Sequence, residues 1–291
     1  MQTSGDQRRE KANAYSVVIP GRAQREPGIH RTAEPVAKWI PGLRQEAHPG
    51  MTRVGGLLRF TRNDNLKPTA PARQRPEEIP MLTLHHLNDS RSQRILWLLE
   101  ELGTPYEMKR YQRSAETRLA PPELARIHPL GKSPVITDGD TTIAESGAVV
   151  DYIIRRYGQG KDKPAMMPAP GSADYEAYNE WLHYSEGSAM LPLMLNLYVS
   201  RLKEAGAPLH PRIDSELANH LGYVDGALKG REFFVGASLT GADIQMSFVG
   251  EMAKVFGKLD PYPNLAAWLE RMHARPAFRR SIEKGGPYRF A

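Results

Sequence analysis

One run of residues in this 291-residue chain determines the fold of the segment that it opens: Leu82-Thr-Leu-His-His-Leu-Asn-Asp-Ser-Arg-Ser-Gln-Arg-Ile-Leu-Trp-Leu-Leu-Glu-Glu-Leu-Gly103. Apolar and polar residues alternate over Leu82–Leu87, which predicts a β-strand. The polar run Asn88–Ser92 predicts a turn, and apolar residues then recur at helical spacing until Gly103, the residue type favoured just past a helix. A second strand is predicted over Tyr106–Tyr111. These segments form a β-α-β unit, whose strands run parallel.

Shorter elements continue the chain. Prolines open a short helix in Pro121–Pro129, where the first helical turn tolerates them. Leu130–Thr137 enters a strand through a Ser-Pro bond. An Asp138-Gly-Asp140 turn joins that strand to a partner over Thr141–Ala144, which predicts a hairpin. A helix follows that begins with Glu145-Ser146-Gly147. The predicted order is therefore strand, helix, strand, short helix, two strands, helix.

Three motifs in this order carry a family resemblance. They are the Ser90-Arg91-Ser92 turn before Arg94-Ile-Leu-Trp-Leu98, the run His128-Pro-Leu-Gly-Lys-Ser-Pro134, and Ile143-Ala-Glu-Ser146. Together they resemble the cytosolic glutathione S-transferases, of a serine-type, non-cysteine, bacterial or fungal-like kind, over essentially Met81–Ala291. The resemblance implies an α/β thioredoxin-like N-terminal domain over 81–160 and an all-α C-terminal helical domain over 172–291.

The resemblance also implies a glutathione site. It places Glu145 on the γ-glutamyl ammonium and Ser146 on the γ-glutamyl carboxylate, together with helix N-terminal amides, which favour anions. The peptide of Ser133, before a cis Pro134, would pair with the cysteinyl backbone of glutathione like an added strand. Lys132 would meet the glycyl carboxylate.

Each of these residues also has an ordinary structural interpretation. Glu145 and Ser146 are common residue types at helix starts. Lys132 can be a solvated loop lysine, and Pro134 can rigidify a turn. Singly, these interpretations are favoured; together and in this order, the residues favour the ligand site. Ser133 departs from the family, which more often has valine, isoleucine or leucine there.

Ser90 is predicted to activate the glutathione thiol. A free thiol has a pKa of about 8.5 or a little above, and a hydroxyl donor near the N-terminus of the first helix would lower that pKa. Asn88 and Ser92 are neighbouring donors that stay open as alternatives. Ser90-x-x-Gln93 also matches a helix capping box, which would occupy the serine side chain. Counting back from the end of the helix places the serine of the family nearer Asp89.

The C-terminal half is predicted to be helical throughout, with helical spacing over Tyr175–Leu197 and Ile213–Leu228. The run Leu239-Thr-Gly-Ala-Asp-Ile244 carries a capping box, in which Thr240 and Asp243 satisfy each other's amides. The same box precedes the core helix of the second domain in the family. The predicted role of Asp243 is therefore structural and not catalytic.

The first 80 residues differ in composition from the rest. They hold 14 Lys and Arg against 8 Asp and Glu, with nine prolines and seven glycines, whereas residues 81–291 carry no net charge. This composition favours a disordered extension, because little apolar surface is available to offset the entropy of ordering the backbone. Three interpretations stay open: translation that starts at Met81, a disordered tail, and a basic arm for anionic surfaces.

Composition also argues against several classes of function. The chain contains no cysteine, so a disulfide, a thiolate metal site and a catalytic cysteine are excluded. No metal site is expected from the histidines, because His85 and His86 are adjacent on a strand and point to opposite faces. No apolar run reaches the roughly 18 residues of a membrane span. The neutral charge balance of 81–291 argues against a nucleic-acid partner.

The function that the resemblance implies is that of a glutathione transferase. Glutathione is expected as co-substrate, with its thiolate attacking a small hydrophobic electrophile or, as a peroxidase, a hydroperoxide. A role in detoxification, a cytoplasmic location and a homodimer are expected with it. The alternative is a glutathione-transferase-like module that binds ligands or proteins without turnover.

Overall fold

The structure is a computed structural model that describes residues 81–160 and 162–291. The predicted extension over 1–80 lies outside the described residues. The described residues all belong to one compact unit. No helix in these two ranges combines the length and the apolar character that a bilayer crossing requires.

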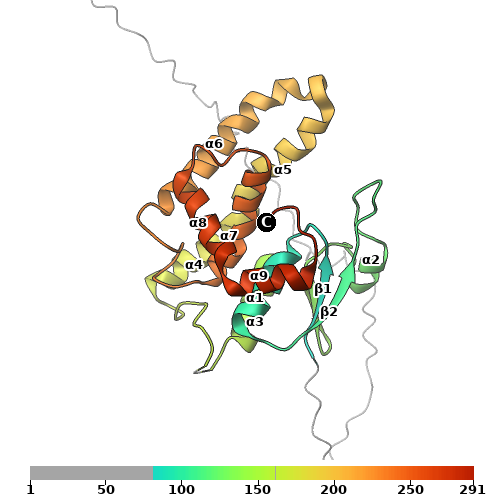
Figure 1. Ribbon diagram of the computed structural model, residues 1–291, viewed down its shortest axis with the longest axis vertical. Coiled ribbons are helices and arrows are strands. Elements are labelled where there is room, and N and C mark those ends of the chain that lie inside the picture. Colours follow the sequence, from blue (N-terminus) through green and yellow to red (C-terminus); the bar gives the residue numbers. More distant parts are fainter. Residues whose placement is uncertain (1–80, 161) are drawn as a thin grey trace, which may run out of the picture. The chain divides into compact units, whose positions relative to one another are not determined.

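A four-stranded sheet forms the first half of this unit (Figure 1). Its strands are β1 (Thr83–Leu87), β2 (Glu107–Tyr111), β3 (Val135–Asp138) and β4 (Thr141–Ala144), in the spatial order β2-β1-β3-β4. β1 and β2 run parallel, and β3 is antiparallel to both β1 and β4. The predicted parallel pair and the predicted hairpin are both present.

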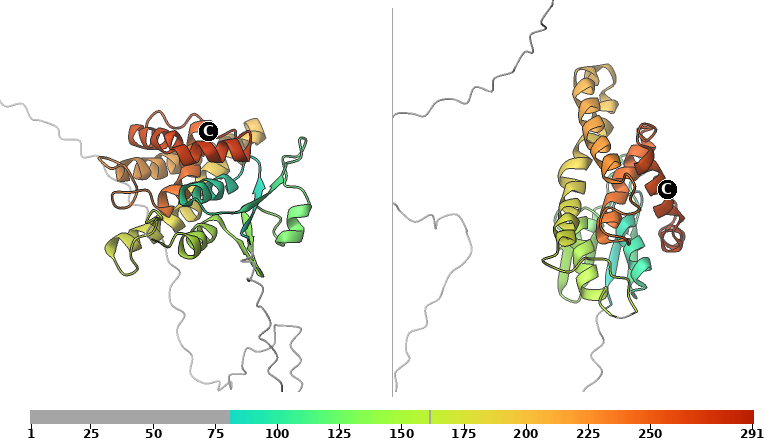
Figure 2. Two further views of the ribbon diagram at one scale, coloured as in Figure 1. Left: turned by 60° about the horizontal axis from the view of Figure 1, so that its bottom comes forward. Right: turned by 90° about the vertical axis from the view of Figure 1, so that its left-hand side faces the viewer.

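Three helices accompany the sheet: α1 (Ser92–Leu102), α2 (Glu123–Ile127) and α3 (Ser146–Tyr157). α1 and α3 lie on one face of the sheet and α2 lies on the other (Figure 2). α1 ends at Gly103, whose φ of 56° is left-handed and costs glycine little. The predicted thioredoxin-like α/β arrangement is confirmed.

β1 is buried along its whole length, although its sequence alternates. Alternation predicts one covered face, but this inner strand is covered on both faces. Its two histidines bond to different neighbours. His85 Nδ1 lies 2.9 Å from the Tyr111 hydroxyl, while His86 Nδ1 lies 2.9 Å from Ser92 Oγ. Buried polar side chains in this strand are thus hydrogen-bonded, as burial requires.

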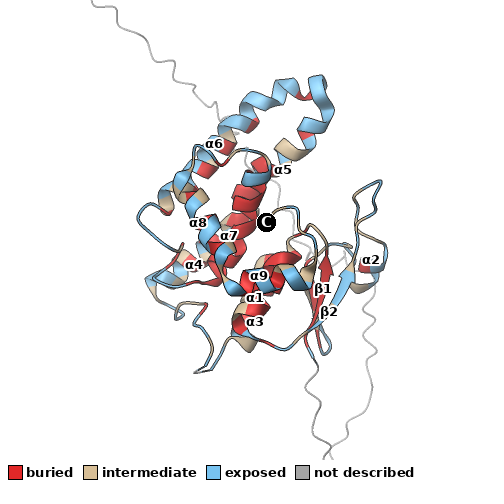
Figure 3. Ribbon diagram, in the orientation of Figure 1, coloured by how far each residue is buried: buried red, intermediate tan, exposed pale blue. Residues whose placement is uncertain are grey.

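Residues 162–291 are helical, as predicted. Their elements are α4 (Ala173–Tyr184), a π-helical turn η1 (Ser185–Ala189), α5 (Met190–Val199), a 3₁₀ segment η2 (Ser200–Leu209), α6 (His210–Ala227), α7 (Gly241–Val255), α8 (Pro263–Ala274) and α9 (Pro276–Gly285). The predicted helix over Tyr175–Leu197 is therefore interrupted by η1. Figure 3 shows that α7 is buried over most of its length.

The predicted capping box at the start of α7 is present. The Thr240 amide donates to Asp243 Oδ2 at 2.9 Å. Asp243 also accepts from the Phe234 amide at 3.0 Å and from the Trp268 indole at 3.3 Å. This carboxylate is fully buried, and it joins the loop before α7 to α8. Its role in the fold is structural.

Replacing Asp243 with alanine is expected to lower the free energy of unfolding by at least about 2 kcal/mol, because buried donors lose their acceptor. Urea unfolding measures this loss. Asp214→Ala is the control. Asp214 is exposed and, among the residues that the structure describes, pairs with the half-exposed Lys258 alone; its cost should stay within about 0.5 kcal/mol. Equal costs for the two variants would contradict a structural role for Asp243.

Candidate functional site

Strand register brings the predicted site residues to one edge of the sheet. Val135, at the start of β3, lies opposite His85 in β1 and Ala144 at the end of β4. Ser90 follows the end of β1, Pro134 precedes β3, and Glu145 follows β4. The three segments that carry the predicted residues therefore converge at this edge, beside the N-termini of α1 and α3.

The loop before β3 has the predicted backbone. The Ser133–Pro134 peptide bond is cis. The Ser133 hydroxyl donates to the His85 carbonyl at 2.9 Å, which ties this loop to β1. Pro134 is buried, whereas Lys132 is exposed. Lys132 forms no ion pair within the described part of the chain, so its ammonium is available to an anion.

Glu145 and Ser146 do not cap α3, contrary to their ordinary interpretation. Glu145 holds the N-cap position without a side-chain capping bond, and its φ of 68° is unusual for a residue other than glycine. Its side chain is exposed. Ser146 begins the helix and is 4% exposed. Its hydroxyl bonds to distant residues instead of the backbone amides of α3.

Two buried donors surround the Ser146 hydroxyl. Gln245 Nε2 in α7 donates to Ser146 Oγ at 2.9 Å, and Arg94 Nη1 in α1 donates at 3.3 Å. A hydroxyl has two acceptor positions and one proton. Because both acceptor positions are filled by the protein, the proton of Ser146 is left to bond to an acceptor outside this cluster.

Arg94 is held by an ion pair across the two halves of the unit. It is 1% exposed. Its Nη1 lies 2.5 Å from Glu186 Oε1, and its Nη2 lies 3.1 Å from Ser185 Oγ. Arg91 Nε also contacts Glu186, at 2.8 Å. Burial alone would raise the pKa of the Glu186 carboxyl, but the two guanidinium groups hold that pKa below its ordinary value.

A cavity of about 470 Å³ adjoins Ser146. Its lining includes three carboxylates and no lysine or arginine. The carboxylates come from Glu145, Asp151 and Glu186, and Gln245 also lines the cavity. Glu186 is already paired with Arg91 and Arg94, and Asp151 is paired with Arg155. Among the described residues Glu145 has no ion pair, so its carboxylate is the one open to a cationic group such as an ammonium.

The capping box predicted for Ser90 and Gln93 is wrong. Arg91 is the N-cap of α1 and makes no side-chain capping bond. The Gln93 amide bonds to the backbone carbonyl of Ser90, not to its side chain. The Gln93 side chain instead donates to Ser281 Oγ at 2.8 Å. The Ser90 hydroxyl instead accepts from the backbone amide of Ser92 at 3.2 Å, and Ser90 is 5% exposed.

A chain of hydrogen bonds connects Ser90 to His86. Ser90 Oγ lies 2.8 Å from Ser92 Oγ, which lies 2.9 Å from His86 Nδ1. Ser92 Oγ also lies 3.1 Å from the Leu87 carbonyl, so its single proton has internal acceptors at His86, Ser90 and Leu87. Ser92 is 0% exposed, so its hydroxyl is turned into the protein and not toward a bound thiol.

Ser90 and Asn88 remain as donors. The Ser90 hydroxyl has two internal acceptors, Ser92 Oγ and the Leu87 carbonyl, each at 2.8 Å. The single proton of Ser90 can form a hydrogen bond with only one of them at a time. Rotation of the hydroxyl can direct the same proton to a third acceptor, such as a bound thiolate. Asn88 Oδ1 accepts from the Arg113 amide at 2.8 Å. That bond leaves its Nδ2 group free to donate.

The buried His86 is expected to make stability pH-dependent. Burial, with a smaller effect of Arg110, lowers the pKa of His86 from about 6.5 to about 4. Between these values the unfolded chain binds a proton that the native protein does not, so stability falls as the pH falls. The loss from pH 8 to pH 5 should be about 2 kcal/mol through this residue.

Urea unfolding at both pH values measures this effect in the wild type and in His86→Gln. The difference between pH 8 and pH 5 should shrink by about 2 kcal/mol in His86→Gln. His183→Gln is the control because His183 is exposed, and it should leave the difference unchanged. The same pH dependence in the wild type and in His86→Gln would contradict the assignment.

Sequence reasoning missed Arg94, Glu186 and Gln245. Arg94 stands inside one of the three motifs, and Gln245 stands two residues after the capping box. Neither carries a local signal for contact with Ser146. Of the residues that sequence reasoning singled out, Ser146 contacts Arg94 and Gln245. Glu145 lines the same cavity as Glu186 and Gln245, whereas Lys132 does not line it.

Family profiles match both halves of the chain. The profile described as "Glutathione S-transferase, N-terminal domain" matches residues 80–155. The profile described as "Glutathione S-transferase, C-terminal domain" matches residues 188–276. The matches fall on the sheet-containing half and on the helical half.

Individual proteins with similar sequences include two yeast enzymes. Glutathione S-transferase 3 of Schizosaccharomyces pombe is 36% identical over 70% of this chain and 88% of its own. Glutathione S-transferase 1 of Saccharomyces cerevisiae is 32% identical over 71% of this chain and 96% of its own.

Solved structures show the same likeness. A glutathione S-transferase from Actinobacillus pleuropneumoniae has a TM-score of 0.65 at 34% identity, over 72% of this chain and 94% of its own. A glutathione transferase from Phanerochaete chrysosporium, solved with oxidized glutathione, has a TM-score of 0.61 at 23% identity, over 72% of this chain and 96% of its own. At that identity the second likeness concerns the fold alone.

Proposed function

The chain belongs to the glutathione S-transferase family and is a glutathione transferase, and from this premise we propose where it binds glutathione and how it uses the thiol. The γ-glutamyl end lies at the start of α3, between Ser146 and the acidic cavity. The cysteinyl backbone lies along Ser133, and the thiol points to the loop after β1. The bound thiolate then attacks an electrophilic carbon.

One observation carries this proposal: the Ser146 hydroxyl is left to donate outward, beside a cavity where Glu145 offers a carboxylate that no described residue pairs with. The γ-glutamyl end of glutathione bears a carboxylate and an ammonium on the same carbon. A donor next to carboxylates matches that pair of charges. Ser146 would donate to the carboxylate, while Glu145 would accept from the ammonium. The N-terminus of the twelve-residue helix α3 adds favourable partial positive charge at the carboxylate.

The remaining contacts follow from the edge of the sheet. The Ser133 peptide before the cis bond offers its backbone groups to the cysteinyl residue, as in strand addition. Lys132 has no ion-pair partner among the described residues and would contact the glycyl carboxylate. Glutathione would thus run along the loop before β3. Its γ-glutamyl ammonium would lie near Glu145, and its glycyl carboxylate would lie near Lys132.

We propose Ser90 as the donor to the glutathione sulfur. It lies at the start of α1, where the helix N-terminus also favours a thiolate. In the reaction the sulfur forms a bond to carbon while the leaving group departs with its electron pair. Holding both reactants in one site and stabilising the thiolate supply the rate. The same thiolate would reduce a hydroperoxide: an S–O bond forms as the O–O bond breaks, the alcohol leaves after taking up a proton, and a second glutathione thiol converts the sulfenic acid to glutathione disulfide with loss of water.

Ser146→Ala is expected to weaken glutathione binding about tenfold, because one charge-assisted hydrogen bond is lost. Isothermal titration of the full chain with glutathione measures this change. Ser200→Ala, in the exposed start of η2, should bind as the wild type does. Unchanged affinity in Ser146→Ala would contradict the placement of the γ-glutamyl end.

Four further expectations belong to the same proposal. A hydrophobic electrophile beside the thiol, a role in detoxification, a cytoplasmic location and a homodimer all come from the family resemblance. Conjugation of glutathione to a chloronitrobenzene tests the first of these. Sedimentation of the full chain tests the dimer. Glutathione binding without conjugation of any electrophile would favour the alternative, a binding module.

A further inference from the structure

Asp89, the residue before Ser90, has an unusual backbone. Its φ is 48°, in the left-handed region that residues other than glycine rarely adopt. Aspartate and asparagine tolerate this region better than most residue types, but the conformation persists only where the surrounding structure holds it. Because Asp89 is bonded directly to Ser90, its backbone angles set the position from which the Ser90 hydroxyl points. What holds Asp89 therefore also positions Ser90.

Two distant segments of the chain hold the Asp89 carboxylate. Its Oδ2 lies 2.7 Å from Arg118 Nη2, in the loop between β2 and α2. Its Oδ1 accepts from the backbone amide of Arg289 at 3.0 Å, in the segment after α9. Arg118 is 29 residues from Asp89, and Arg289 is 200 residues away. The Asp89 side chain is only 8% exposed, so salt and solvent screen this ion pair less than a surface pair.

Arg113 holds the backbone of the same residues. Its Nε donates to the Asn88 carbonyl at 3.1 Å, and its Nη2 donates to the Asp89 carbonyl at 3.2 Å. Its Nη1 donates to the Arg118 carbonyl at 3.0 Å. Arg118 is left-handed as well, with a φ of 61°. One guanidinium thus fixes the carbonyls of both left-handed residues, and the side chains of these two residues form the ion pair.

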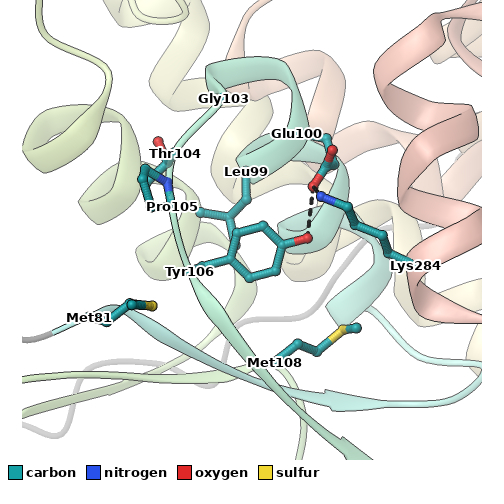
Figure 4. Close-up of a pocket in the computed structure, with 9 residues that line it drawn as sticks. All are labelled: Met81, Leu99, Glu100, Gly103, Thr104, Pro105, Tyr106, Met108 and Lys284. Atoms are coloured by element: carbon teal, nitrogen blue, oxygen red, sulfur yellow. Dashed lines mark hydrogen bonds and ion pairs between the residues drawn. The ribbon is translucent and has the colours of Figure 1, made fainter.

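The helix that follows Ser90 is itself held firmly. All residues of α1 except Glu101 are buried. Figure 4 shows the last turn of α1, where the Lys284 ammonium and the Tyr106 hydroxyl both contact the Glu100 carboxylate. Their distances to Glu100 Oε1 are 2.6 Å and 2.8 Å. Because α1 is anchored at this end and buried along its length, a change at residue 89 moves the loop before the helix and not the helix.

The hydrogen bonds of Ser90 stay within its own segment. Its hydroxyl contacts the Leu87 carbonyl and the Ser92 hydroxyl, and its carbonyl accepts from the Gln93 amide. These bonds shape the turn but do not tie it to another part of the protein. The contacts that fix this turn against the loop after β2 and the segment after α9 are made by the residue before Ser90, which is Asp89.

We propose that Asp89 is a positioning residue for glutathione transfer: its carboxylate, bound by Arg118 and the Arg289 amide, keeps the Ser90 hydroxyl aimed at the glutathione sulfur. This inference rests on the proposed role of Ser90. Without the carboxylate, residue 89 relaxes toward a right-handed backbone, and the hydroxyl turns away from the sulfur. A misplacement of about 1 Å can cost about 10²-fold in rate.

Asp89→Ala tests this role in the full chain. It should lower kcat for conjugation of glutathione to a chloronitrobenzene about twentyfold. It should also raise the apparent pKa in the pH profile of kcat/KM, because the thiolate loses its aligned donor. A loss of folded protein alone would not move that pKa. Glutathione affinity, measured by calorimetry, should stay within about twofold of the wild type, since Ser146 lies on a different segment.

Asp89→Asn is the conservative variant. Its amide oxygen still accepts from Arg289, and asparagine tolerates a left-handed backbone, so only the ion pair with Arg118 is lost and kcat should fall about threefold. Arg118→Met removes the same pair from its 41% exposed partner. It should give the same loss, and it serves where Asp89→Ala is too unstable to assay. Asp214→Ala is the matched control, because Asp214 is an exposed aspartate paired with Lys258; its kcat should equal that of the wild type.

The double variant Ser90→Ala/Asp89→Ala separates this inference from the proposed function. Because Asp89 acts through Ser90, Asp89→Ala should cost less than about twofold in the Ser90→Ala background. Full activity in Ser90→Ala would refute the role of Ser90 and this inference with it. A large loss in Ser90→Ala, together with wild-type kcat in both Asp89→Ala and Arg118→Met, would overturn this inference alone. An equal loss from Asp89→Ala in both backgrounds would overturn it too.

Discussion

Ser90→Ala is expected to lower kcat/KM for conjugation of glutathione by about 10²-fold or more. The Ser90 hydroxyl has one proton and two acceptors within the protein, the Leu87 carbonyl and Ser92 Oγ, which both lie 2.8 Å away. A thiolate is a stronger acceptor than either, because a hydrogen bond to a charged group is about twice as strong. Removing the donor raises the pKa of the bound thiol, so less nucleophile is present at neutral pH. The affinity for glutathione should change little.

Asn88→Ala and Ser92→Ala are the matched comparisons. Ser92 bonds to both Ser90 and His86 in the hydrogen-bond chain and is fully buried, so its loss should act only through the position of Ser90. The pH profile of kcat/KM separates the cases, because loss of the thiol partner moves the apparent pKa upward. Full activity in Ser90→Ala together with a large loss in Asn88→Ala would transfer the role to Asn88.

Glu186→Gln is expected to lower the free energy of unfolding by about 3 kcal/mol. Arg94 is 1% exposed, and Glu186 is its only ion-pair partner in the described ranges. The amide keeps the shape and one hydrogen bond but leaves the buried guanidinium without its counter-charge. An uncompensated buried charge costs far more than an exposed one. Glutathione affinity should fall as well, since Arg94 donates to Ser146.

Two variants frame this result. Arg94→Met removes the buried cation, and Glu186 then keeps Arg91 as a partner at 2.8 Å; its cost should be smaller than that of Glu186→Gln. Glu216→Gln breaks the ion pair with the exposed Arg212 and should cost less than about 1 kcal/mol. Urea unfolding measures all three. A Glu186→Gln cost no larger than that of Glu216→Gln would mean that the buried pair does not hold the two halves together.

Local signals made much of the fold predictable. Gly103 marks the end of α1, where its left-handed backbone is observed. The Asp138-Gly-Asp140 turn marks the hairpin of β3 and β4. Thr240 and Asp243 mark the start of α7 through a box that spans four residues. In each case the interacting groups lie within a few residues of one another, so the pattern is visible in the sequence.

Long-range contacts were not predictable in this way. Arg94 and Glu186 are 92 residues apart, and Ser146 and Gln245 are 99 residues apart. No periodicity connects such pairs. The failed capping box has the same cause, because Gln93 turns to Ser281, which is 188 residues away. The burial of β1 on both faces also depends on what packs against the strand, and alternation within the strand carries no such information.

The residue types of the site were predictable, but the direction of the hydrogen bonds at Ser146 was not. The resemblance assigned Glu145 and Ser146 to the γ-glutamyl end of glutathione. Only the structure shows that Arg94 and Gln245 fill both acceptor positions of the Ser146 hydroxyl. Because these two donors leave only the proton of the Ser146 hydroxyl unused, Ser146 would donate to a carboxylate and not accept from an ammonium. The Glu145 carboxylate beside it would supply the complementary charge.

The ultraviolet absorbance of the glutathione thiolate, followed against pH in the full-length protein, tests the central claim most directly. The claim is that this chain binds glutathione and lowers the pKa of its thiol. The wild type should show a thiolate that titrates at least about one unit below the value of a free thiol, and Ser90→Ala should bind glutathione but lose that shift. A bound thiol that titrates in the wild type as it does in free glutathione would contradict the account.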